Sequence, residues 1–332
     1  MNIIQRPSTK EFSATMKDYT IDSDAVITFS VKYNNKTILD EEYVPDADFK
    51  IHVRKLGKFC QQALWGEWCT GSSLLQSSAA GTFEFYINNS LDTSSYVLFC
   101  RMQTNKPAAS AAWLSEINRK ITRLDSKEYA STIITPGQAI QVTVKKTDGT
   151  TTPAKTLYTH TGTLCVVTVD ASPSRIATLF LIPQDAIRSY VLSVAGQNFE
   201  FLIDSTRYTE VWQFRYKNVY DMPEVLSAVG GLNVKGNNEG ETAAMFEVER
   251  KFALKVTDEY TANSGVIFLQ SDYKLWHNLF NAQEVQIYIA GTWYSIIITK
   301  QTYEREFRRS TLKAVEFSFK MANPEQNNLI EL

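Results

Sequence analysis

The chain has 332 residues, 44% hydrophobic and 12% aromatic, enough to bury ordinary cores in two or three domains. Its 34 lysines and arginines against 36 aspartates and glutamates give a formal net charge of −2, which provides no global attraction for nucleic acid or an anionic membrane. No secretion signal and no apolar run of roughly 20 residues is visible, which predicts synthesis in the cytoplasm without a signal peptide and no membrane insertion.

In the first region, apolar residues alternate with period two, which predicts strands at residues 27–31, 83–87 and 96–102. Between them, Arg54 to Trp65 carries apolar residues at helical spacing, which predicts a helix over one end of a sheet. A proline and small residues at 106–110 then interrupt the pattern and predict a linker.

In the second region, residues 112–124 fit either a short helix or a strand-bearing connection. Five further strands are predicted at residues 140–144, 164–169, 176–182, 190–194 and 199–203. The gaps between these strands are too short for the helices of a parallel sheet, which favours a sandwich.

In the third region, glycines bracket residues 230–242, a stretch with little to bury, which predicts a mobile surface loop. A docking helix is predicted at 271–280. Strands are predicted at residues 211–216, 246–256, 285–289, 293–299 and 312–321.

The sequence therefore predicts a mainly β protein with antiparallel, sandwich-like domains and one or two short docking helices. We place the domains at residues 1–108, 109–207 and 208–332. Whether residues 109–332 form one core or two stays open, as do strand order and oligomeric state.

Residues that carry catalysis or bind metal are sparse. The four cysteines show no C-x-x-C spacing, the three histidines are scattered, and Asp22, Asp24, Asp46 and Asp48 suit turns better than a calcium loop. No Walker loop, serine elbow or dinucleotide fingerprint occurs. The sequence predicts no catalytic, metal or cofactor-binding residue and no cofactor.

Aromatic and basic residues are the candidates for an interaction surface. Trp65 and Trp68 bracket a turn, and Trp293 begins a predicted strand; each suits either a core or a stacking surface, and a core position is favoured. Arg305, Arg308 and Arg309 adjoin aromatic residues, and a solvated charge run is favoured there over nucleic-acid binding.

Several segments resemble proteins encoded in prophages of Bacteroides-type gut bacteria. They are residues 42–46, Ala112-Trp113-Leu114, residues 214–224 from Phe214 to Glu224, and the closing stretch 312–322. The resemblance implies a tail or baseplate component of a virion that assembles with itself and with other virion proteins, and it carries over no catalytic residue.

Two alternatives stay open from the sequence. A carbohydrate-binding or adhesion module would display coplanar exposed tryptophans to a host-surface glycan, although the missing export signal counts against it. A glycoside hydrolase would need a deep pocket with two carboxyl groups roughly 5–10 Å apart.

Overall fold

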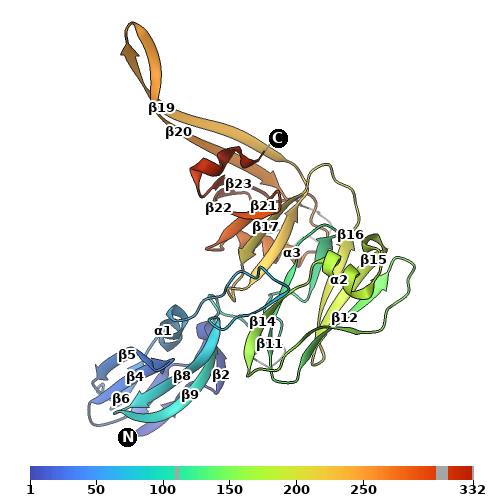
Figure 1. Ribbon diagram of the computed structural model, residues 1–332. Coiled ribbons are helices and arrows are strands. Elements are labelled where there is room, and N and C mark those ends of the chain that lie inside the picture. Colours follow the sequence, from blue (N-terminus) through green and yellow to red (C-terminus); the bar gives the residue numbers. More distant parts are fainter. Residues whose placement is uncertain (109–111, 304–312, 331–332) are drawn as a thin grey trace.

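The computed structural model describes residues 1–108, 112–303 and 313–330. They form a mainly β protein, as predicted, with few short helices (Figure 1). The α-helices are α1 (Leu56–Gln62), α2 (Pro173–Phe180) and α3 (Asp272–Phe280), and the 3-10 turns are η1 (Ser13–Thr15), η2 (Gln184–Ala186) and η3 (Pro324–Leu329).

The N-terminal strands form a three-stranded sheet, β1-β3-β6, and a five-stranded sheet, β2-β9-β8-β4-β5. Apolar residues of both sheets and of α1 share one core, and the β4–β5 turn uses Asn34 and Asn35 with positive φ values of 48° and 60°. These strands are β1 (Asn2–Gln5), β2 (Lys10–Phe12), β3 (Tyr19–Asp22), β4 (Ile27–Tyr33), β5 (Lys36–Tyr43), β6 (Lys50–Val53), β8 (Ala80–Ile87) and β9 (Ser90–Leu98).

The middle strands form a five-stranded sheet, β10-β16-β15-β12-β13, and a three-stranded sheet, β11-β14-β7. β7 comes from the N-terminal part of the chain, so this second sheet crosses the predicted boundary at residue 108. The boundaries at 108 and 207 stay predictions. These strands are β7 (Ser73–Leu75), β10 (Arg119–Arg123), β11 (Tyr129–Ile134), β12 (Ala139–Lys146), β13 (Lys155–Thr159), β14 (Cys165–Asp170), β15 (Ile187–Val194) and β16 (Gln197–Asp204).

The C-terminal strands form one seven-stranded sheet in the order β18-β17-β21-β22-β23-β20-β19. One apolar cluster joins it to the middle strands, from Trp113 to Ile330, so the two regions are packed together. Within the described ranges, strand pairing is antiparallel except for β2 with β9 and β10 with β16. These strands are β17 (Trp212–Lys217), β18 (Pro223–Ala228), β19 (Leu232–Met245), β20 (Val248–Asn263), β21 (Val285–Ile289), β22 (Thr292–Gln301) and β23 (Glu316–Met321).

Two sequence predictions are wrong. Residues 176–182, read as a strand, lie largely in α2, because Pro173 opens a helix whose buried face carries Ile176, Ala177 and Phe180. Residues 230–242, read as a mobile loop, lie largely in β19, because β20 pairs with that strand along its whole length.

The paired strands β19 and β20 extend well beyond the sheet. They pair from Leu232 opposite Ala262 to Met245 opposite Val248, whereas β23 pairs with β20 only over Tyr260–Asn263. Figure 1 shows the resulting two-stranded ribbon projecting from the molecule. We call residues 233–259 the arm; at about 3.3 Å per residue it is about 40 Å long.

A buried charged cluster lies where β10, β11 and α3 meet. Lys120 Nζ lies 2.7 Å from Glu128 Oε2, and both side chains are almost fully buried. Asp272, at the start of α3, accepts a hydrogen bond from the Ile121 backbone N–H at 3.3 Å. Burial raises the pKa of Asp272 to about 7, so this carboxyl group changes its charge near neutral pH.

The raised pKa of Asp272 predicts that stability falls as pH rises from about 4 to about 7, because the folded state binds this proton more tightly than the unfolded state. Asp272→Asn keeps an oxygen for the Ile121 N–H but carries no charge. We expect the excess of its free energy of unfolding over that of wild type to grow by roughly 2–3 kcal/mol between pH 5 and pH 8. Urea unfolding across this range measures the difference; a pH-independent difference would contradict the assignment.

Candidate functional site

The turn that follows α1 is clamped against the connection between β17 and β18. A Cβ atom on Gly66 would lie 1.9 Å from the carbonyl oxygen of Asp221, so only glycine fits there. The Gly66 N–H donates to Asp221 Oδ2 at 2.6 Å. Burial raises the pKa of Asp221, while Lys217 Nζ lies 3.9 Å from the same oxygen. These contacts fix the turn to the C-terminal sheet.

Two of the predicted tryptophans meet at one buried arginine. The guanidinium of Arg215, on β17, lies 4.5 Å from the ring centre of Trp68 and 4.6 Å from that of Trp293. Arg215 Nε donates to Gln286 Oε1 at 2.6 Å. Since Arg215 is only 6% exposed, the cation–π attraction acts with little screening by water.

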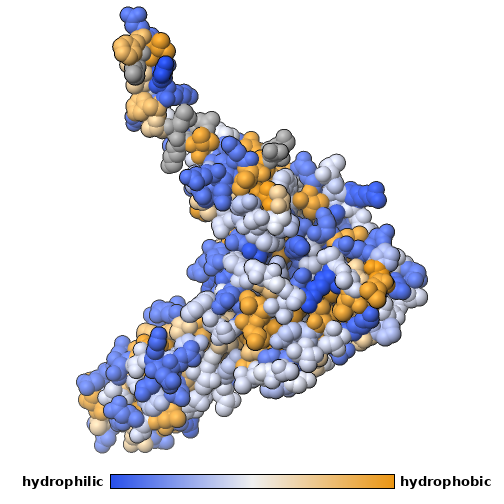
Figure 2. Space-filling view, viewed as in Figure 1, coloured by the Kyte–Doolittle hydropathy of each residue, from blue (hydrophilic) through white to orange (hydrophobic). Residues whose placement is uncertain are grey.

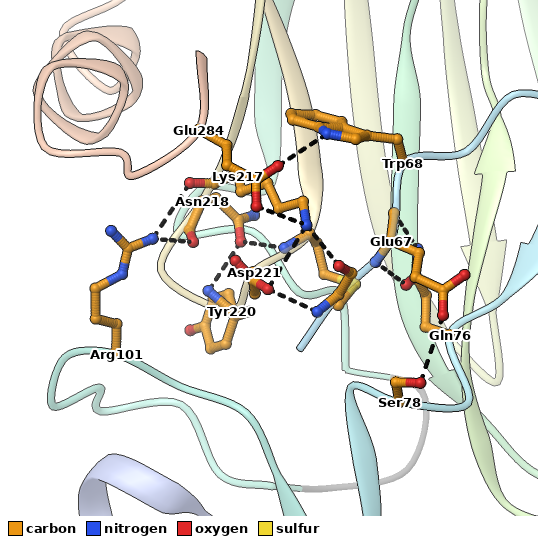
Figure 3. Close-up of polar contacts among 12 residues, drawn as sticks. Glu67, Trp68, Gln76, Ser78, Arg101, Lys217, Asn218, Tyr220, Asp221 and Glu284 are labelled. Carbon is orange, nitrogen blue, oxygen red and sulfur yellow. Dashed lines mark hydrogen bonds and ion pairs between the residues drawn. The ribbon is translucent and has the colours of Figure 1, made fainter. Parts of the chain in front are cut away.

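A second set of polar contacts ties Trp68 to the same sheet (Figure 3). Trp68 Nε1 donates to Glu284 Oε2 at 3.0 Å, and Lys217 Nζ lies 3.4 Å from Glu284 Oε1. Lys217 also donates to the Gly66 carbonyl oxygen at 2.5 Å. Arg101 donates to the carbonyl oxygens of Lys217 and Asn218, which joins the chain beyond β9 to the same place.

We call Trp68, Arg215, Lys217, Glu284 and Trp293 the tryptophan cluster. Lys217 pairs with Glu284, Arg215 donates to the Gln286 side chain, and burial lowers the pKa of Arg215. The ring faces that contact the guanidinium are not free for a ligand. The cluster therefore acts as a joint that holds the N-terminal part of the chain to the base of the C-terminal sheet.

The other predicted interaction residues lie elsewhere. Trp65 is 54% exposed, and its backbone N–H donates to the carbonyl oxygen of Ser78. Arg305, Arg308 and Arg309 lie outside the described residues. Of the three predicted tryptophans, Trp68 and Trp293 both contact Arg215, whereas Trp65 is not part of the tryptophan cluster.

Sequence reasoning missed Arg215, Lys217 and Glu284. Arg215 and Lys217 alternate with Phe214 and Tyr216 on β17, and this pattern signals a strand with two basic residues on one face. The sequence carries no signal that these residues meet Trp68, because the contact joins residues about 150 positions apart.

The cysteine and histidine that lie closest do not form a catalytic pair. Cys165 Sγ lies 3.5 Å from His160 Nε2, but that nitrogen also lies 2.6 Å from the carbonyl oxygen of Thr163. A carbonyl oxygen can only accept, so Nε2 carries the proton and cannot take one from the thiol. Burial raises the pKa of Cys165, which keeps the thiol protonated.

The cavity that holds three carboxyl groups is too small for a sugar. Glu128, Asp204 and Asp272 line a space of about 70 Å³, whereas ligand pockets usually measure roughly 300–1,000 Å³. A more open hollow of about 590 Å³ is lined by Glu200, whose carboxylate is held by Arg119 at 2.6 Å. Within the described part of the chain, no group of three or more His, Cys, Asp or Glu side chains could hold a metal ion.

Arg215→Ala should lower the free energy of unfolding by about 2 kcal/mol, because it removes two cation–π contacts and leaves Gln286 without its donor. Urea unfolding followed by tryptophan fluorescence measures the change. Arg188→Ala, at an exposed position on β15, is the matched control and should fall within about 0.5 kcal/mol of wild type. Equal free energies of unfolding for the two variants would show that the tryptophan cluster does not contribute to stability.

No known protein family matches the chain, and no curated protein matches its sequence. Among solved structures, a chain from the tail of an empty gene transfer agent particle, refined with C6 symmetry, is similar at 13% identity and a TM-score of 0.23, covering 30% of this chain and 82% of that one. A chain from the virion of a native gene transfer agent particle is similar at 10% identity and a TM-score of 0.25, covering 36% and 95%. These are partial likenesses to proteins of phage-like particles.

None of the helices in the described ranges is long and apolar enough to cross a membrane.

Proposed function

We propose that the protein is a non-catalytic structural component of a phage-like particle, in the tail or baseplate, that assembles with copies of itself through the arm. The observation that carries this proposal is that β19 and β20 extend beyond the sheet as a two-stranded ribbon, whose outer edges pair with no other strand of the described residues. The origin in a Bacteroides-type prophage, suggested by the sequence resemblance, stays a prediction.

The arm has two different free edges. Among the described residues, β19 has β20 as its only strand partner, and β20 has no strand partner besides β19 over residues 248–259. Asn327 of η3 caps one carbonyl on this second edge, that of Val256. An isolated two-stranded ribbon is marginally stable in water, and its open backbone groups pair readily with another strand.

The two edges favour head-to-tail association. If the β19 edge of one copy pairs with the β20 edge of the next, each copy uses a different surface on each side. Such heterologous contacts close into a ring when the rotation between copies allows it. Ring formation would give every arm a strand on both sides and remove the exposed edges.

Residues of the arm that have positive φ values support a role for the arm in contacts between copies. Phe246 and Glu247 form its terminal turn with φ values of 52° and 64°, and Ala253 has φ 49° beside the irregularity opposite residues 239–241. Bulky residues adopt this left-handed conformation at a cost. Phe246 is also 89% exposed, so its ring gains little from burial in the single chain.

Size-exclusion chromatography with light scattering, over a range of protein concentrations, tests the proposal. A closed oligomer of fixed size supports it, whereas a strict monomer at every concentration argues against self-assembly. A carbohydrate-binding module is the second candidate, because Trp65 is 54% exposed. It has less support, since Trp68 and Trp293 are engaged with Arg215; a glycan array with the full chain would detect it.

A further inference from the structure

The end of the N-terminal sandwich that points away from the rest of the chain carries exposed apolar side chains. β4 and β5 pair as far as Ile27 opposite Tyr43, so the adjoining Val26 and Val44 lie close together beyond the strand ends. They are 52% and 74% exposed. The opposite end of this sandwich packs on the other regions through Leu98 and its neighbours. In Figure 1 the sandwich forms the blue lobe, and Figure 2 shows orange among the blue on its surface.

Phe49 is the third member of this surface. It is 62% exposed and belongs to the turn that leads into β6. The backbone N–H of Ser23 donates to its carbonyl oxygen at 3.0 Å, which places the turn beside the segment of Val26. We call Val26, Val44 and Phe49 the distal patch.

Hydrogen bonds hold Phe49 in an unfavourable conformation. Asp46 Oδ1 accepts the backbone N–H groups of Asp48 at 2.9 Å and Lys50 at 2.8 Å, and the Asp46 carbonyl oxygen accepts the N–H of Phe49 at 3.1 Å. The hydrogen bond from Lys50 is the main cause that lowers the pKa of Asp46. Phe49 has φ 57°, a left-handed conformation that is rare for bulky residues and recurs at functional sites. The turn thus fixes the backbone of Phe49 and leaves its ring largely in solvent.

The charge around the distal patch is predominantly negative. The adjoining segments 22–28 and 41–50 contain six aspartates and glutamates but a single lysine. Carboxylates repel an anionic lipid surface and attract lysine and arginine side chains. Two copies of the patch would also repel one another, so the charge favours a different, basic surface.

We propose that the distal patch docks a protein partner whose surface offers an apolar pocket flanked by lysine and arginine side chains, with Phe49 as the anchor. An exposed aromatic residue on a backbone that is already fixed loses less conformational entropy on binding than one on a mobile loop, and central aromatic residues contribute strongly to protein interfaces. The proposal is independent of the arm, because the patch lies in the N-terminal sandwich and needs no residue of β19 or β20.

A labelled peptide of alternating leucine and lysine serves as the probe, and the same peptide with glutamate in place of lysine serves as its charge control. Fluorescence anisotropy measures binding to the full chain. Phe49→Asn is the informative variant, because asparagine tolerates the left-handed conformation and the turn should fold at least as well. Leu181→Ser, at an apolar position that is 86% exposed and outside the patch, is the matched control.

We expect the basic peptide to bind wild type and Leu181→Ser equally, to bind Phe49→Asn at least about tenfold more weakly, and to lose affinity as salt is added. The thermal midpoint of Phe49→Asn should equal or exceed that of wild type. Equal binding by Phe49→Asn, or equal binding of the basic and acidic peptides to wild type, would overturn the proposal. So would Phe49-dependent binding to vesicles of neutral phosphatidylcholine in place of the peptide.

Discussion

A chain in which an Asn-Gly turn replaces residues 236–258 should fold normally but remain a monomer under conditions where the intact protein forms a closed oligomer. Lys235 and Glu259 face each other across the two strands, so a two-residue turn can join them without moving the sheet. The deletion removes nearly all of the two free edges. Light scattering gives the mass, and circular dichroism shows whether the sheets remain.

The matched control keeps the arm and repairs its turn. Phe246→Asn with Glu247→Gly places residues that accept positive φ where the chain now has 52° and 64°, and it should leave the oligomer intact. If the chain without the arm still assembles, the contacts between copies lie elsewhere and the edge-pairing argument fails. If the repaired turn abolishes assembly, the exposed ring of Phe246 contributes to the contact more than the strand edges do.

Local patterns in the sequence were sufficient to predict about half of the strands, and nearly all of the strands that they predicted exist. Alternation at residues 140–144 and 285–289 corresponds to β12 and β21, and helical spacing near residues 54–65 and 271–280 corresponds to α1 and α3. These elements bury one face, so their period is visible in the sequence.

One strand of the arm was predicted, since residues 246–256 correspond to most of the outer part of β20, whereas β19 was read as a loop. The side chains of residues 233–236 and 239–244 on β19 are all exposed, so no apolar period separates a core face from a solvent face. The glycines at 236 and 240 then read as loop signals. What defines β19 as a strand is its backbone pairing with β20, and pairing leaves no trace in side-chain polarity.

The tryptophan cluster shows a different limit. Trp68 and Trp293 were candidates because large aromatic side chains are often buried or part of an interface. Arg215 was not a candidate, because an arginine on a strand usually lies in solvent. Its burial depends on Gly66 and Asp221 bringing the Trp68 turn onto the sheet. Such contacts are set by tertiary packing between distant segments.

Lys120→Met should lower the free energy of unfolding by about 3–5 kcal/mol at pH 7, because it leaves the carboxylate of Glu128 buried without its cation. Both residues are at most 5% exposed, and Thr122 Oγ1 and the lysine ammonium supply the side-chain hydrogen bonds to that carboxylate. Urea unfolding measures the change. Lys36→Met, at an exposed position on β5, should differ from wild type by less than about 0.5 kcal/mol.

The dependence of this loss on pH separates an uncompensated charge from a packing defect. Burial already raises the pKa of Glu128 in the intact protein, and removing the lysine raises it further. As pH falls, the carboxyl group takes up a proton in the folded variant before it does so in the unfolded chain, so the deficit of Lys120→Met should shrink toward pH 5. Adding Glu128→Gln should restore much of the stability at pH 7, since the amide is neutral and its oxygen still accepts from Thr122. Two outcomes would contradict a role for the charge of Lys120: a stability deficit that stays constant with pH, or one that Glu128→Gln leaves unchanged. Lys120 would then stabilise the fold by filling space and by its hydrogen bond to the Val225 carbonyl oxygen.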